Sequence, residues 1–172
     1  MPPVDVLRTY LQLTDPSQLR AAGRDPRLRV ERVESCPPSF YRYLYVEVGK
    51  KWHWRDRIEW TDERIARHLA DPAVSLWVGC VSGAPAGWFE LVRHGDGSVE
   101  IAYFGLLPER TGRGLGRRLL TDAVERAWSL GATRVWLHTC SLDSPAALPN
   151  YLARGFVSFK EERYTTTIAD GA

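Results

Sequence analysis

The pattern of apolar and polar positions predicts strands and helices that alternate along most of the chain. Strands are expected where apolar residues alternate with polar ones, or run together briefly between glycine- and proline-bearing turns. Helices are expected where apolar residues recur three or four positions apart, as they do after the capping residue Thr61. The predicted strands cover residues 4–13, 28–31, 76–81, 86–93, 98–107, 135–139, 156–159 and 163–168. The predicted helices begin near residues 39, 62, 115 and 145.

These elements predict one α/β domain with a mixed sheet. The 172 residues are about one domain's length, and 44% hydrophobic and 26% charged residues match ordinary soluble proteins. We find no internal repeat, low-complexity tract or linker. Residues 1–26 are expected to add an N-terminal strand and turn, although Leu7 and Leu11 also have helical spacing, and residues 169–172 are expected to fray.

Charge and cysteine content exclude several classes of partner. The formal net charge of +2 gives no reason to expect nucleic acid or an anionic membrane as a partner. The chain lacks an apolar run of the roughly 20 residues that cross a bilayer, and it does not begin with a basic segment followed by an apolar one, so we expect a cytoplasmic protein. Cys36, Cys80 and Cys140 are widely spaced, which predicts reduced thiols and no metal site.

The most informative segment is the glycine-rich turn at residues 107–118, between a predicted strand and a predicted helix. Glycines let backbone N–H groups approach a ligand, and a helix N-terminus adds unpaired donors and a partial positive charge. Arg110, Arg113, Arg117 and Arg118 add cations that pair well with phosphate. The turn therefore predicts a site for a phosphate or pyrophosphate, although a solvated arginine face stays possible.

Two familiar phosphate loops do not fit this turn. A Walker A loop requires a lysine followed by serine or threonine, whereas Arg117 and Arg118 stand there. A dinucleotide-binding turn belongs to the first strand–turn–helix of a parallel unit and is followed by an acidic residue at the end of the next strand. This turn comes after a meander of three strands, and the strand that follows it has no such acid.

The turn and a second motif resemble the GNAT superfamily of acetyl-CoA-dependent N-acetyltransferases. The segment Thr111-Gly112-Arg113-Gly114-Leu115-Gly116 stands in the register of the family's loop, with Thr111 in place of the usual Gln or Arg. Tyr151-Leu152-Ala153-Arg154-Gly155-Phe156 matches the family's second element, with Ser144 where asparagine is usual. The resemblance covers residues 76–159, which it identifies as the cofactor-binding and catalytic core of a single N-acetyltransferase domain over residues 1–172.

The resemblance implies a fold and a reaction. The fold is a mixed, mostly antiparallel sheet of about six to seven strands flanked by about four helices. The reaction is transfer of an acetyl group from acetyl-CoA to a primary amine of a small molecule, by direct attack in a ternary complex, and a homodimer is possible. The implied cofactor-binding residues are Leu106, Leu107, Arg110, Thr111, Gly112, Arg113, Gly114, Leu115, Gly116, Arg117 and Ser144.

Two residues are candidates for proton transfer. Tyr151 keeps its proton at neutral pH, because a phenol has a pKa of about 10, and can donate it to a departing thiolate with a pKa of about 8.5. By resemblance, Glu100 is the base that takes a proton from the amine, often through a water. Tyr151 packed under Gly155-Phe156, a solvent-facing Glu100, Glu90 as the base and a water chain without a dedicated base all stay open.

The acceptor site is expected among aromatic residues of the N-terminal half. Trp52 and Trp54 lie outside any helical pattern, so we expect at least one to line the acceptor pocket beside Trp88 or Glu90 of the strand 86–93. Two further functions stay open: a catalytically silent acyl-CoA-binding regulatory module, and acetylation of a protein amine.

Overall fold

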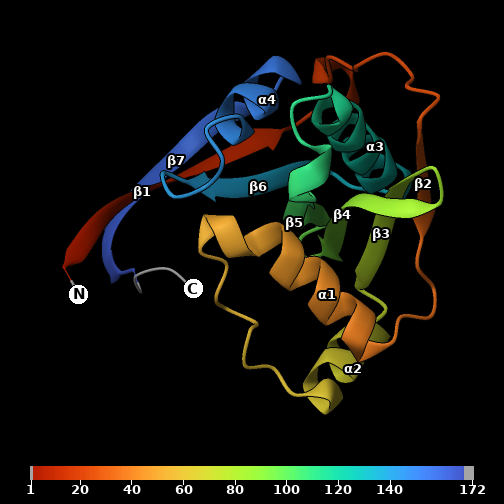
Figure 1. Ribbon diagram of the computed structural model, residues 1–172. Coiled ribbons are helices and arrows are strands. Elements are labelled where there is room, and N and C mark those ends of the chain that lie inside the picture. The colour runs from red at the N-terminus through yellow and green to blue at the C-terminus, as the bar shows by residue number, and fades with distance from the viewer. Residues whose placement is uncertain (1, 169–172) are drawn as a thin grey trace.

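The computed structural model describes residues 2–168, and within them the chain folds into one seven-stranded sheet with four α-helices (Figure 1). The strands are β1 (Pro3–Leu13), β2 (Leu28–Arg32), β3 (Val74–Val81), β4 (Ala84–Arg93), β5 (Ser98–Leu106), β6 (Arg134–Cys140) and β7 (Val157–Thr167). The helices are α1 (Pro38–Gly49), α2 (Asp62–Ala70), α3 (Leu115–Ser129) and α4 (Ala147–Ala153). The predicted fraying of residues 169–172 falls outside the described residues.

The sheet is mixed and mostly antiparallel, as predicted. Its strand order is β2-β3-β4-β5-β6-β1-β7, and β5 with β6 is the parallel pair in this part of the chain. The strands β3, β4 and β5 form the expected meander. The N-terminal strand β1 lies inside the sheet, between β6 and β7, so the two ends of the described chain run side by side (Figure 1).

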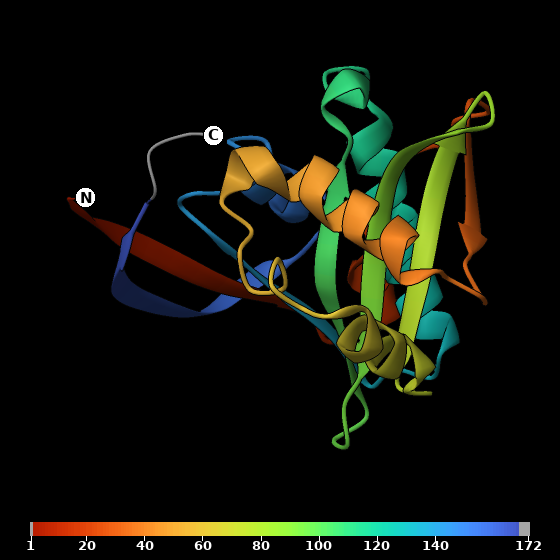
Figure 2. The ribbon, with the colours of Figure 1, turned by 60° about the horizontal axis from the view of Figure 1, so that its bottom comes forward.

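Helices cover both faces of the sheet, α3 on one face and α1 with α2 on the other (Figure 2), and an apolar cluster packs on each side. One packs α3 against β4, β5 and β6 through residues such as Leu119, Leu120 and Phe89. The other packs α1 and α2 against the opposite face. Tyr41 and Tyr45 of α1 are buried there and pack the helix onto the sheet. Thr61 caps α2 as predicted, because its Oγ1 accepts from the Arg64 N–H at 3.2 Å.

The parallel pair β5–β6 ends after three residues. Residues 98–100 pair with residues 134–136, and no described residue of β6 pairs with the rest of β5. The other edge of β5 stays bonded to β4, with a register shift between Glu90 and Leu91. The sheet therefore opens at its centre, between the C-terminal halves of β5 and β6.

The C-terminal end differs from the prediction. Two strands were expected at 156–159 and 163–168, but residues 157–167 form the single strand β7. The segment between the two expected strands, residues 160–162, is polar. It still forms part of β7, because the eleven-residue strand β1 pairs with it along its length, with a register shift between Tyr10 and Leu11.

Leu120 tests the placement of the core between α3 and the sheet. Its side chain is fully buried, so Leu120→Ala should cost about 2–5 kcal/mol through lost burial and a residual cavity. In a domain of this size the melting temperature should fall by roughly 4–20 °C, measured by calorimetry. Leu152→Ala makes the same change on the exposed side of α4 and should have a small effect. Equal losses in the two variants would contradict this core.

Candidate active site

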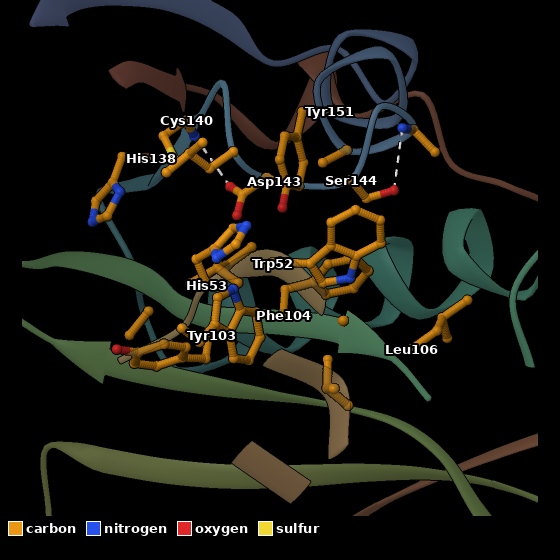
Figure 3. Close-up of a pocket in the computed structure, with 18 of the residues that line it drawn as sticks. Trp52, His53, Tyr103, Phe104, Leu106, His138, Cys140, Asp143, Ser144 and Tyr151 are labelled. Carbon is orange, nitrogen blue, oxygen red and sulfur yellow. Dashed lines mark hydrogen bonds between the residues drawn. The ribbon is translucent and has the colours of Figure 1, made fainter. Parts of the chain in front are cut away.

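A cavity of about 900 Å³ occupies the opening between β5 and β6 (Figure 3). Its walls come from the C-terminal half of β5, the end of β6, the glycine-rich turn, α4 with the segment before it, and the segment 52–57. Residues of β1 and β7 close one side. The residues that sequence reasoning proposed from distant parts of the chain thus meet at one place.

The glycine-rich turn gives the cavity an open helix N-terminus. Gly112 and Gly114 have φ angles of 75° and 79°, in the left-handed region where a side chain is strained. The turn leads directly into α3, which begins at Leu115 and has no side chain that caps its N-terminus. The first N–H groups of α3 have no intrahelical partner and are available to an anion. Gly112, Gly114, Gly116 and Thr111 line the cavity.

The arginines of this turn have different surroundings. Arg117 lines the cavity. Arg118 instead bonds to Asp122 at 2.7 Å and to Glu125 at 3.0 Å, so its charge is used on the surface of α3. Arg110 and Arg113 do not line the cavity. Of the four arginines within residues 110–118, Arg117 is therefore the one that lines the cavity.

Leu106 and Leu107, at the end of β5, also differ in what they offer the cavity. The Leu107 N–H donates to the Ala86 carbonyl at 2.8 Å, and the Leu107 side chain is buried, so this residue offers the cavity no free N–H group. Backbone groups alternate in direction along an antiparallel pair, so the N–H and C=O of Leu106 face away from β4, toward the cavity. Leu115 is buried and contributes to the core. Leu106 and Ser144 line the cavity.

Tyr151 points its hydroxyl into the cavity from α4, between Asp143 and Trp52 (Figure 3). Its ring is 6% exposed and lies edge-on to Phe104 and Phe156, with centroids 6.2 Å and 6.1 Å away. The hydroxyl has no hydrogen bond to a described residue. Burial, and then the nearby charge of Asp143, raise the pKa of Tyr151, so the phenol is firmly protonated at neutral pH.

Sequence reasoning missed Asp143 and Asn150. The Asp143 carboxylate accepts from the Thr139 hydroxyl at 2.5 Å and from the Cys140 N–H at 3.1 Å, which fixes it at the cavity wall. The Asn150 side chain donates to the Gly116 carbonyl at 3.2 Å and joins α4 to the first turn of α3. An acidic residue four positions after the strand 135–139 was the available signal for Asp143.

Glu100 lines the cavity. Its carboxylate lies 3.0 Å from Nε2 of His94, and within residues 2–168 it pairs with no arginine. Glu100 still pairs with Trp136 of β6, and Phe104, which contacts Tyr151, lies four residues farther along β5. Four residues of strand span about 13 Å, so the backbone of Glu100 lies about that far along β5 from that of Phe104.

Of the four residues proposed for the acceptor, two line the cavity. Trp52 and Trp54 do so, and the Trp54 ring lies 5.0 Å from that of Tyr103. Trp88 and Glu90 are fully buried on β4 and do not line the cavity. Trp88 packs against residues of α1. Its ring stacks on that of Tyr103, which does line the cavity, with the ring centroids 5.9 Å apart.

Glu90 is bonded to groups from three segments. It accepts from Nη1 of Arg57 at 2.8 Å, from the hydroxyl of Tyr41 at 2.9 Å, and it lies 3.1 Å from Nε2 of His68. Burial alone would raise the pKa of Glu90, but the hydrogen bond with His68 and the charge of Arg57 outweigh burial and lower it. Arg57 and His68 line the cavity above it, and neither was proposed from the sequence.

The described residues form neither a metal-binding cluster nor a membrane-spanning helix. Within residues 2–168, no group of three or more histidine, cysteine or acidic side chains is placed to hold a metal ion. None of the helices in this range is long and apolar enough to span a membrane.

The fold and the cavity agree with a family comparison. The model of the acetyltransferase (GNAT) family matches residues 39–156, and the chain belongs to this family. No curated protein sequence is similar enough to count as a relative.

Solved structures share the fold at low sequence identity. A GCN5-related N-acetyltransferase from Sphaerobacter thermophilus has a TM-score of 0.71 at 18% identity, covering 99% of this chain and 55% of that one. Spermidine N-acetyltransferase from Vibrio cholerae, in complex with CoA and spermine, has a TM-score of 0.64 at 21% identity, covering 77% and 82%. This chain spans about half to three fifths of the length of several of its structural neighbours.

Glu90 should make stability depend on pH in a defined direction. Its pKa in the fold is lower than the ordinary value of 4.5, so its contribution is complete above that pH and is lost as the pH falls through the folded pKa. The difference in melting temperature between wild type and Glu90→Gln should thus be constant near neutral pH and shrink below about pH 4.5. Thermal scans from pH 7 to pH 3 measure it. A difference that grows toward pH 3 would contradict this charge state.

Proposed function

We propose that this protein transfers an acetyl group from acetyl-CoA to a primary amine of a small molecule. The observation that supports this most is that one cavity receives both the open N-terminus of α3 and the Tyr151 hydroxyl. An anion site and a proton donor in one cavity are what a thioester with a pyrophosphate tail requires.

The residues present fit acetyl-CoA. The N–H groups of residues 112–117 and the Arg117 guanidinium would hold the pyrophosphate, where a Cβ at Gly112 or Gly114 would strain the backbone. Leu106 would hydrogen-bond the pantetheine arm through its backbone, in place of the missing β6 partner. When bound, acetyl-CoA supplies an activated acyl group that an amine can attack.

Proton transfer is assigned to two residues. Tyr151 donates its hydroxyl proton to the departing sulfur, because its hydroxyl points into the cavity and is protonated at neutral pH. Glu100 receives a proton from the acceptor amine through a chain of water molecules, since about 13 Å of strand separates it from the position of Phe104. Trp52 and Trp54 form an aromatic wall on which the acceptor packs. The cytoplasmic location and the homodimer stay predictions.

Replacement of Tyr151 tests the assignment of the acid. Tyr151→Phe keeps the ring that packs on Phe104 and removes only the hydroxyl, so kcat should fall about 100-fold or more, as measured by release of free CoA. Affinity for acetyl-CoA in isothermal titration should stay within about twofold, because binding uses other groups. Tyr43→Phe removes a hydroxyl from an exposed tyrosine and serves as control. Full activity of Tyr151→Phe would exclude the role of acid.

The reaction itself is tested by CoA release with a panel of small amines and with a lysine peptide. Amine-dependent release that is absent without acceptor supports the proposed function. Release with the peptide alone supports acetylation of a protein amine instead. Tight acetyl-CoA binding with no release from any acceptor, in wild type as in Tyr151→Phe, would favour a silent acyl-CoA-binding module.

A further inference from the structure

The cluster around Glu90 joins the cavity wall to three parts of the fold. Glu90 lies on β4, Tyr41 on α1, His68 on α2, and Arg57 on the connection between α1 and α2. Arg57 Nη1 lies 2.8 Å and 2.9 Å from the two oxygens of Glu90, and also contacts Tyr41 and His68. One buried carboxylate thus gathers donors that are 22 to 49 positions away in sequence.

The buried position of Glu90 makes these bonds necessary. The side chain is fully inaccessible, and removal of a carboxylate from water is unfavourable unless a cation and hydrogen bonds replace the lost hydration. Arg57 supplies the cation with a side chain that is 12% exposed. The position of Arg57 is therefore set by a charge that cannot leave the core.

Arg57 also makes contacts that hold residues 53–59, the segment that carries Trp54 of the aromatic wall. Its guanidinium lies 4.5 Å from the Tyr103 ring and 4.6 Å from the Trp60 ring. Its backbone N–H donates to the Tyr45 hydroxyl at 3.2 Å. The neighbouring backbone bonds from Ile58 and Trp60 return to the connection itself, to Arg55 and to Arg57. Arg57 thus attaches residues 53–59 to the sheet through a buried ion pair, beside the Trp54 ring, which packs on Trp88 and Tyr103.

Glu90 acts on the cavity through Arg57. It does not line the cavity, so it cannot touch an acceptor, whereas Arg57, His68 and Tyr103 do line it. We propose that Glu90 is a positioning residue that holds Arg57 and the segment 53–59 in the shape that binds the acceptor. This inference rests on the proposed function, since it assigns the acceptor side of the same cavity. The cofactor side, built on α3 and α4, does not depend on it.

Hydrogen exchange of the free protein tests the inference without any substrate. Glu90→Gln keeps the size of the side chain and removes its charge, so amides of residues 53–60 should exchange about tenfold faster, while those of residues 111–120 keep their wild-type rates. Glu31→Gln makes the same chemical change at an exposed ion pair and should alter neither segment. Unchanged exchange at residues 53–60 in a folded Glu90→Gln protein would overturn the inference.

Kinetics separate positioning from general loss of structure. With an amine that the panel identifies as acceptor, Glu90→Gln should raise its KM about tenfold or more, with less effect on kcat and with acetyl-CoA affinity within about twofold of wild type. Equal losses of acetyl-CoA affinity and acceptor KM would mean a structural role only. If the amine panel is negative, the proposed function fails while the exchange result still decides the positioning role.

A double variant covers the case in which Glu90→Gln does not fold. Glu90→Gln with Arg57→Gln removes both charges, so no unpaired charge stays buried and thermal stability should recover relative to Glu90→Gln. Exchange at residues 53–60 should stay fast, because the attachment is still missing. Wild-type exchange in that segment of the double variant would show that Arg57 does not hold it, and would overturn the inference.

Discussion

The short pairing of β5 with β6 is the constraint from which the rest of the site follows. Backbone N–H and C=O groups need partners, and β5 loses its β6 partner after Glu100 while it keeps β4 on its other edge. The C-terminal half of β5 is therefore an unpaired strand edge in the middle of a sheet. Such an edge accepts an extended polar ligand, and the cavity of about 900 Å³ gives that ligand room.

The two faces of the sheet contribute different parts of the site at this opening. On one face α3 brings its uncapped N-terminus to the end of β5, and the Asn150 bond to Gly116 sets α4, and so Tyr151, beside it. On the other face α1 and α2 support the aromatic wall, and the buried Arg57–Glu90 ion pair holds the segment that carries Trp54. The cofactor side is thus built from backbone groups and glycines, whereas the acceptor side is built from side chains and one buried charge.

Local patterns in the sequence were enough for the fold and for part of the site. The meander, the helix after Leu115 and the Thr61 cap each depend on residues close in sequence, and all are present. The single strand β7 was missed because its partner β1 lies at the other end of the chain. A polar stretch pairs as well as an apolar one when a partner strand is in place.

The partners of charged and polar groups could not be predicted in the same way. Glu90 and Trp88 belong to a strand that was expected at the pocket, but burial by α1 and by Tyr103 puts them beneath its wall. Arg118 was counted with the anion-binding cations until Asp122 and Glu125 were found beside it. Which of two faces a residue takes, and which opposite charge it meets, depends on packing between distant segments.

Hydrogen exchange of the wild-type protein with and without acetyl-CoA is the most direct test of the central claim, that the edge of β5 and the N-terminus of α3 form one cofactor groove. The account predicts slower exchange of the amides of Phe104, Leu106 and residues 112–117 on addition of acetyl-CoA, with little change in β2 and β3. Saturable binding of acetyl-CoA that protects neither segment would contradict it.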